Sequence, residues 1–117
     1  MTIPPPTLLV NFYRTEAGTE PVRDWLRDLP HSDRKIIGEE IKTVQIGWPL
    51  GMPLVRKMDA DLWEIRISLP GRIARVLFTI EDKQMVLLHG FIKKSQATPK
   101  DDLKTARKRQ KQIRSEP

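Results

Sequence analysis

The residues best suited to chemistry lie in the stretch LWEIRISLPGRIARVLF, residues 62–78, where two apolar runs flank a Pro-Gly turn. Alternation within each run predicts two antiparallel strands, and Pro70-Gly71 at the turn centre sets their register. In that register Arg66 lies directly opposite Arg75, on the face that lacks the large apolar residues. Like charges opposed across a strand pair destabilise it, so this pair requires an explanation.

The sequence leaves two explanations open. Glu64, two positions from Arg66 on the same face, could neutralise one of the arginines. Alternatively the pair binds an anion, because guanidinium groups match phosphate oxygens in a planar fork and stay charged at cellular pH. The third arginine of the stretch, Arg72, falls at the hairpin tip and is predicted to be a steering charge or a plain surface residue.

A following apolar run, residues 84–94, ends in HGFIKK and brings further cations and a ring to the hairpin. The short run before the hairpin, residues 54–58, adds Arg56 and Lys57. An open basic face with an aromatic ring suits single-stranded nucleic acid, whose bases stack while its phosphates meet cations. Each side chain of HGFIKK also has an ordinary explanation, as a core residue or a solvated charge: His89, Phe91, Lys93 and Lys94.

The surrounding elements predict one α+β domain over residues 1–117, in the order β-α-α-β-β-β-α. A strand is expected within residues 8–14, after a flexible leader of seven residues. Apolar spacing predicts helices over 19–29 and 32–47, with Thr19 capping the first and Ser32 starting the second. A short basic helix and tail follow from Thr98. We expect a small, mainly antiparallel sheet with the two N-terminal helices packed on one face.

Composition narrows the class of partner. The chain has 117 residues, no cysteine, two histidines and a net charge of +6, so disulfide frameworks and thiolate or histidine-rich metal sites are not expected. Residues 100–117 hold seven basic against three acidic residues, which favours a phosphate-bearing partner or a solvated tail. With no signal-peptide pattern and no apolar run of membrane length, we expect a cytoplasmic protein without metal or cofactor.

The elements LWEIR, RVLF and LLHGFIKKSQATP occur in an order and spacing that resembles the phage-derived HigB-like toxins of the RelE/ParE superfamily, over about residues 8–112. The resemblance implies the toxin of a type II toxin–antitoxin pair, typically a metal-independent, ribosome-associated endoribonuclease that cuts messenger RNA. Its chemistry would be attack of a ribose 2′-hydroxyl on the neighbouring phosphate, which needs charge stabilisation, a base and an acid.

On this resemblance Arg66 and Arg75 clamp the scissile phosphate, and Lys94 adds a phosphate contact. Lys57 is the candidate base and His89 the alternative proton carrier. The residues expected to hold RNA without reacting are Phe91, which would stack a base, together with Lys93, Arg56 and Arg72.

Two residues depart from common patterns of the resembled family. Phe78 stands where many members have tyrosine, so no phenol is available there, and Ser95 replaces a frequent threonine. The implied partners are a HigA-like antitoxin with a helix-turn-helix domain, messenger RNA and the ribosome. Alternatives are a ParE-like gyrase inhibitor without catalysis and an inactive phage-derived relic. The helix from Thr98 could be a docking surface, a ribosomal RNA contact or a cap on the core.

Overall fold

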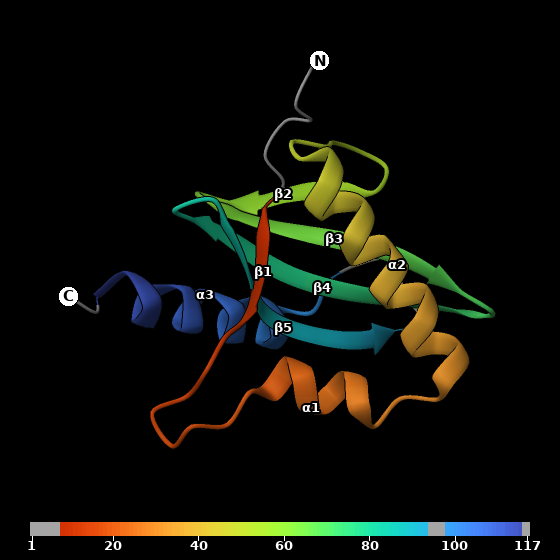
Figure 1. Ribbon diagram of the computed structural model, residues 1–117, viewed down its shortest axis with the longest axis horizontal. Helices are drawn as coiled ribbons and strands as arrows, with labels where there is room; N and C mark the ends of the chain where they lie inside the picture. Colours follow the sequence, from red (N-terminus) through yellow and green to blue (C-terminus); the bar gives the residue numbers. More distant parts are fainter. Residues whose placement is uncertain (1–7, 94–97, 116–117) are drawn as a thin grey trace, which may run out of the picture.

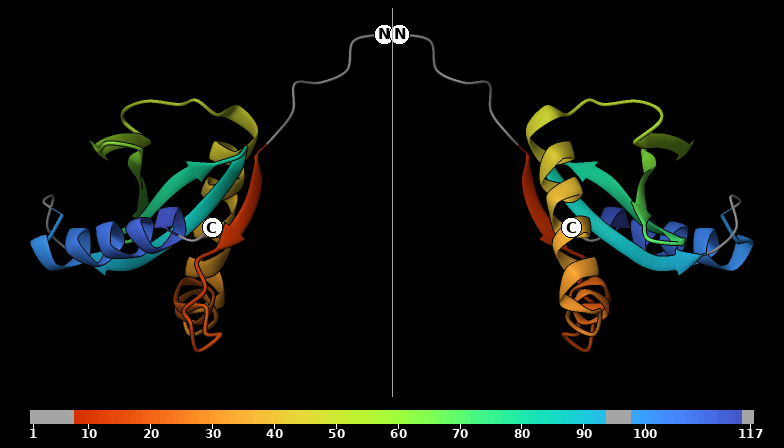
Figure 2. Two further views of the ribbon diagram at one scale, coloured as in Figure 1. Left: turned by 90° about the vertical axis from the view of Figure 1, so that its left-hand side faces the viewer. Right: turned by 90° about the vertical axis from the view of Figure 1, so that its right-hand side faces the viewer.

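The fold is described by a computed structural model over residues 8–93 and 98–115. Within these residues one five-stranded sheet lies between two helices on one side and a third helix on the other (Figures 1 and 2). This confirms the predicted α+β class, although in the described residues four strands, and not the three of the predicted order, follow the second helix. No helix of the described part has the length and apolar character needed to cross a membrane. The elements are β1 (Leu9–Phe12), α1 (Pro21–Arg27), α2 (His31–Gly47), β2 (Val55–Asp59), β3 (Leu62–Leu69), β4 (Arg72–Glu81), β5 (Gln84–Lys93) and α3 (Lys100–Ser115).

The sheet has the strand order β1-β5-β4-β3-β2. Strands β2 to β5 run antiparallel to their neighbours, whereas β1 pairs in parallel with β5 at one edge. The predicted hairpin register is confirmed, with Leu69 opposite Arg72 and Arg66 opposite Arg75. Alternation around a Pro-Gly turn therefore located both arginines on one face of the sheet.

Helices α1 and α2 cover the face that carries the alternating apolar residues of the hairpin, including Ile65, Ile67 and Val76. Trp25 of α1 lies directly against Gly90 of β5, where an added Cβ atom would come within 2.4 Å of the indole ring. The glycine therefore permits this close approach of helix and strand.

Both helices begin one or two residues away from the predicted caps. Helix α1 starts at Pro21, and the hydroxyl of Thr19 pairs instead with Thr15 at 2.6 Å. Helix α2 starts at His31, because the amide of Arg34 donates the first hydrogen bond of the helix to the carbonyl of Pro30. Local hydroxyl pairing explains the first difference, since such bonds compete with helix capping.

Helix α3 covers part of the opposite face, which we had expected to be open (Figure 2). Its apolar residues Leu103, Ala106 and Ile113 pack on Leu77 and Leu88 of the sheet. The thin stripe is sufficient because Ala106 is fully buried. The expectation of an open arginine face is thus wrong for the part of the sheet that lies under α3.

Candidate functional site

An extra residue in β5 sets which side chains of this strand face α3. Leu77 pairs with His89 and Phe78 pairs with Leu87, so Leu88 is left over as a β-bulge. The bulge shifts the alternation by one residue. His89 therefore shares a face with Leu77, and Leu88 is buried on that face as well. Strand parity alone left the orientation of His89 undecided, because a bulge has no reliable signal in the sequence.

Beyond the start of α3 the same face is less covered, and we call this region the open half. It consists of Arg66, Ser68, Ile73, Phe91 and Lys93. In the sheet register, one row across β3, β4 and β5 holds Arg66, Arg75 and Phe91. The next row on the same face holds Ser68, Ile73 and Lys93. Arg66, Phe91 and Lys93 are half-buried, so each has a fixed stem and an accessible part.

A groove of about 490 Å³ opens from this region around the free end of β3. Its walls include Arg66, Ser68 and Ile73 of the open half, and Ile36 and Glu40 of α2. Strand β2 pairs with β3 only as far as Ile65, which leaves the last residues of β3 at the edge. The open half is therefore continuous with a cleft that can admit an extended ligand.

Arg75 is not part of this accessible surface. Its side chain is fully buried and forms an ion pair of 3.0 Å with Glu64, which is fully buried too. The Thr98 hydroxyl accepts a hydrogen bond from Arg75 at 2.9 Å and donates one to the other oxygen of Glu64. In this structure Arg75 is inaccessible to a ligand, because a buried arginine requires a buried partner and Glu64 supplies it; the expected phosphate contact stays a prediction.

Thr98, where the basic helix was expected to begin, places its side chain on the ion pair. The amide of Leu103 bonds the carbonyl of Pro99, so α3 begins just after the threonine. Of the two explanations for the opposed arginines, neutralisation by Glu64 is confirmed for Arg75.

Arg72 is also committed to a carboxylate. Both terminal nitrogens of its guanidinium bond Asp33 at 2.9 Å, which joins the hairpin tip to the start of α2. These hydrogen bonds raise the pKa of Arg72 above its ordinary value. Arg72 was predicted to be a steering charge or a plain surface residue; the structure adds that its guanidinium is paired with the buried Asp33.

His89 is held on both sides of its ring. Its Nε2 lies 2.6 Å from Asp102 Oδ1, and its Nδ1 lies 3.4 Å from a terminal nitrogen of Arg109. Arg109 also donates to the carbonyl of Leu88 at 2.8 Å, and burial lowers its pKa, which the nearby Tyr13 partly offsets. The role of His89 as a proton carrier stays a prediction, with Asp102 at one ring nitrogen and Arg109 near the other.

The remaining predicted residues divide between the two faces. Arg56 pairs with Glu64 across β2 and β3, so it lies on the face of the arginines, and its side chain is exposed. Lys57 pairs with Trp63, whose ring packs on the α2 side, so the candidate base points away from Arg66. Phosphate binding by Lys94 stays a prediction, because Lys94 lies outside the described residues.

Phe78, at the position where many members of the resembled family have tyrosine, lies in the core and not at the candidate site. Phe78 is fully buried against Trp48 and Trp63, with ring centroids 5.5 and 5.9 Å away. A side chain at this position of β4 points into the core beneath α2, opposite to the open half. The missing phenol therefore takes no group away from the candidate site.

The open half can bind a phosphate and a base together. Arg66 and Lys93 supply positive charge, Phe91 supplies an aromatic face and Ser68 supplies a hydroxyl. None of these five residues is a histidine or a carboxylate, so Lys93 is the one side chain of the set that belongs to a class of general base. No sequence pattern marks the partners Asp33, Thr98 and Asp102, because each belongs to a different element from the residue that it holds.

Residues 24–111 match the model of a protein family described as Phage derived protein Gp49-like (DUF891). The match includes the hairpin, the following strand and most of α3. No curated protein matches the chain significantly.

Proposed function

The chain belongs to the phage-derived Gp49-like family, and we propose that it is the toxin of a type II toxin–antitoxin pair. In this proposal it stops translation as a metal-independent endoribonuclease that cuts messenger RNA on the ribosome. The resemblance of LWEIR, RVLF and LLHGFIKK to HigB-like toxins supports the toxin assignment.

One observation carries the ribonuclease proposal: Arg66, Phe91 and Lys93 share one half-buried surface beside an edge groove. A single RNA strand would place a base on Phe91 and its phosphate between the two cations. Arg66 would stabilise the charge that develops on the phosphate as the 2′-hydroxyl attacks. The cations are held by a sheet rather than a loop, so little reorganisation is needed on binding.

The proton transfers would be supplied from outside the open half. Lys94 is kept from the resemblance as a further phosphate contact. The RNA itself or the ribosome could provide the remaining groups. The partners in this proposal are messenger RNA, the ribosome and a helix-turn-helix antitoxin that neutralises the toxin.

The contacts of Arg75 and His89, two of the residues predicted to be catalytic, favour a second function without catalysis. Arg75 is fully buried against Glu64, and His89 has partners at both nitrogens. A protein binder that inhibits DNA gyrase without catalysis would not need either group to be available. The shared family therefore leaves this non-catalytic toxin as the alternative proposal.

The experiment is induction of the chain in a bacterial host, with separate measurement of protein and DNA synthesis and primer extension on a reporter messenger RNA. The proposal predicts rapid loss of protein synthesis and new cuts within translated codons. Induction of the DNA-damage response with intact messenger RNA would replace the ribonuclease by the gyrase inhibitor. Normal growth would leave an inactive relic of the family.

A further inference from the structure

The basic residues of α3 fall into two groups that differ in what they contact. The helix lies on the sheet through Leu103, Ala106 and Ile113, so its other residues occupy two flanks and an outer ridge. Charges on the flanks are bound to the rest of the fold. Those on the ridge point away from the sheet.

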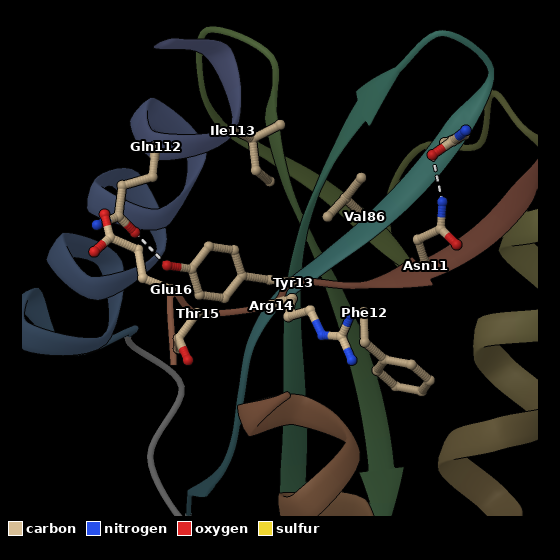
Figure 3. Close-up of a pocket in the computed structure, with 10 residues that line it drawn as sticks. Asn11, Phe12, Tyr13, Arg14, Thr15, Glu16, Val86, Gln112 and Ile113 are labelled. Atoms are coloured by element: carbon tan, nitrogen blue, oxygen red, sulfur yellow. Dashed lines mark hydrogen bonds between the residues drawn. The ribbon is translucent and has the colours of Figure 1, made fainter. Parts of the chain in front are cut away.

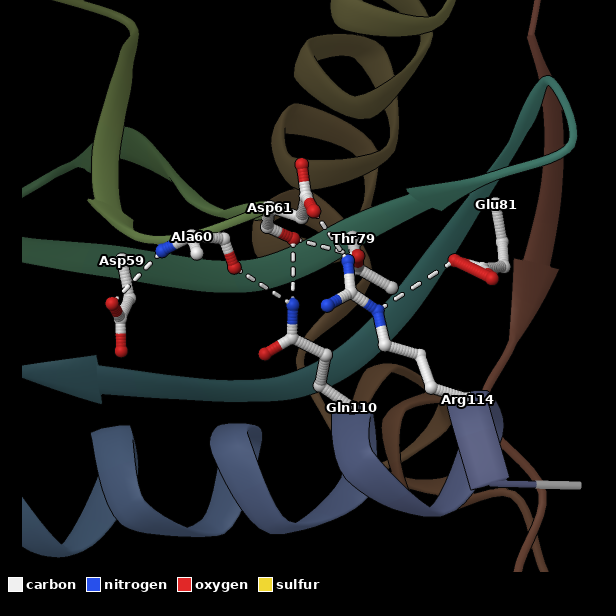
Figure 4. Close-up of polar contacts among 7 residues, drawn as sticks. All are labelled: Asp59, Ala60, Asp61, Thr79, Glu81, Gln110 and Arg114. Atoms are coloured by element: carbon white, nitrogen blue, oxygen red, sulfur yellow. Dashed lines mark hydrogen bonds and ion pairs between the residues drawn. The ribbon is translucent and has the colours of Figure 1, made fainter.

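One flank is joined to the turn between β2 and β3. Gln110 donates to the carbonyls of Ala60 and Asp61 at 3.0 and 2.9 Å (Figure 4). Arg114 pairs with the carboxylate of Asp61, as Figure 4 also shows. On the same flank Arg107 pairs with Asp59 at 2.8 Å. The two arginines are therefore neutralised where they stand.

The other flank is joined to the segment that follows β1. The hydroxyl of Tyr13 donates to the side chain of Gln112, and Ile113 completes this wall of a pocket (Figure 3). Arg109 lies over the Tyr13 ring, 5.3 Å from its centroid. Further along, Asp102 holds His89. These contacts fix the rotation of α3 about its own axis.

With both flanks fixed, Lys100, Lys104 and Lys108 form a straight row on the outer side, which we call the lysine ridge. All three side chains are exposed, and the described residues place no ion pair on any of them. Successive members are four residues apart, which is about 6 Å along the helix axis. Asp101 is the acidic neighbour on this outer side.

This arrangement is unfavourable for an isolated helix. Like charges four residues apart repel each other, and Lys100 lies at the N-terminus, where the helix dipole disfavours a cation. The flanking arginines instead have carboxylate partners on the sheet side, in Asp59, Asp61 and Glu81. A ligand of high negative charge would convert the repulsion along the ridge into binding energy.

We infer that Lys100, Lys104 and Lys108 dock the phosphate backbone of double-helical RNA, an inference that rests on the proposed function and gives the toxin a second RNA contact. Helix α3 carries no aromatic residue, so the ridge cannot stack unpaired bases as the open half can. Paired RNA is recognised through its phosphates and shape, which a row of lysine point charges suits. The ridge also lacks the apolar residues that an interfacial membrane helix would insert.

The test measures binding of a blunt RNA hairpin by fluorescence anisotropy over a series of potassium chloride concentrations. The ridge variant carries Lys100→Gln, Lys104→Gln and Lys108→Gln, which remove three charges and keep a good helix former at each site. The control variant carries Lys35→Gln, Lys42→Gln and Lys83→Gln, which remove three exposed charges from other elements. Circular dichroism checks that both variants are folded.

Each lost phosphate contact reduces the slope of log K against log salt by about 1. We therefore expect the ridge variant to lose roughly 2 to 3 units of slope, and the control to stay near wild type. An unchanged slope in the ridge variant, or an equal loss in the control, overturns the inference. A ridge variant that keeps the RNA slope but binds polyglutamate more weakly would also overturn it, in favour of an acidic protein.

The hairpin measurement does not depend on cleavage. A wild-type chain that binds the hairpin through the ridge but cuts no messenger RNA would refute the ribonuclease and leave the ridge standing. Cleavage of messenger RNA together with a ridge variant of unchanged slope would refute the ridge and leave the ribonuclease standing.

Discussion

Arg66 and Arg75 face each other across one strand pair, yet they lie in regions with opposite physical demands. Arg75 is under Thr98 beside the start of α3, where water is excluded and Glu64 must match its charge. Arg66 lines the edge groove of the open half, where a charge can meet a ligand, and lies two strands away from Phe91. Position relative to α3, rather than residue type, therefore separates the fully buried arginine from the half-buried one.

The largest effect is expected in the covered region. Glu64→Ala leaves the Arg75 charge buried without a carboxylate, which should lower the free energy of unfolding by about 3–5 kcal/mol. Urea denaturation followed by tryptophan fluorescence measures this directly. The double variant Glu64→Leu, Arg75→Met should recover most of the loss, because apolar residues of similar size can replace a buried ion pair. A loss below about 1 kcal/mol in Glu64→Ala would mean that the pair is solvated in solution.

An intermediate effect, on binding rather than folding, is expected in the open half. Phe91→Leu removes the aromatic face and should weaken binding of a short single-stranded RNA by about 1–3 kcal/mol. Phe91→Tyr keeps the ring and serves as the matched control, with affinity close to that of wild type. Fluorescence anisotropy with a labelled oligonucleotide gives both values. Equal affinity for all three proteins would remove Phe91 from the RNA contact.

A smaller loss of stability is expected when only the Thr98 hydroxyl is removed and the Glu64–Arg75 ion pair is kept. Thr98→Val keeps the shape of the side chain but removes the hydroxyl between Glu64 and Arg75. We expect a loss of about 1–2 kcal/mol in unfolding free energy, in the range of hydrogen bonds to charged groups. The melting temperature, measured by circular dichroism, should fall less than in Glu64→Ala. A larger fall than in Glu64→Ala would mean that Thr98 holds α3 in place by other contacts.

Much of the architecture could be predicted because it depends on local patterns. Alternation in residues 62–78 and the Pro-Gly turn give the hairpin register, and helical spacing gives α1 and α2. Which arginine is buried against Glu64 could not be predicted in the same way. Glu64 is placed to neutralise either neighbour, and the packing of α3 with Thr98, more than thirty residues later, decides that it is Arg75.

The orientation of β5 was beyond prediction for a related reason. The bulge at Leu88 moves His89, Phe91 and Lys93 onto the face of α3, and no turn or glycine marks it at that position. Asp102 and Arg109 then hold the histidine ring. These contacts of His89 could not be predicted, because both partners belong to a helix whose packing on the sheet is set only in the folded chain.

We propose that Arg66, and not Arg72 or Arg75, is the arginine of the hairpin that messenger RNA cleavage requires. The most direct measurement is primer extension on a reporter messenger RNA after induction of wild type, Arg66→Gln and Arg72→Gln. Each variant removes one positive charge from the same hairpin. Arg72 is the matched control, because its guanidinium is bound to Asp33 at the start of α2. We predict cuts within codons for wild type and Arg72→Gln, and none for Arg66→Gln when all three proteins accumulate equally. Undiminished cutting by Arg66→Gln would contradict the account.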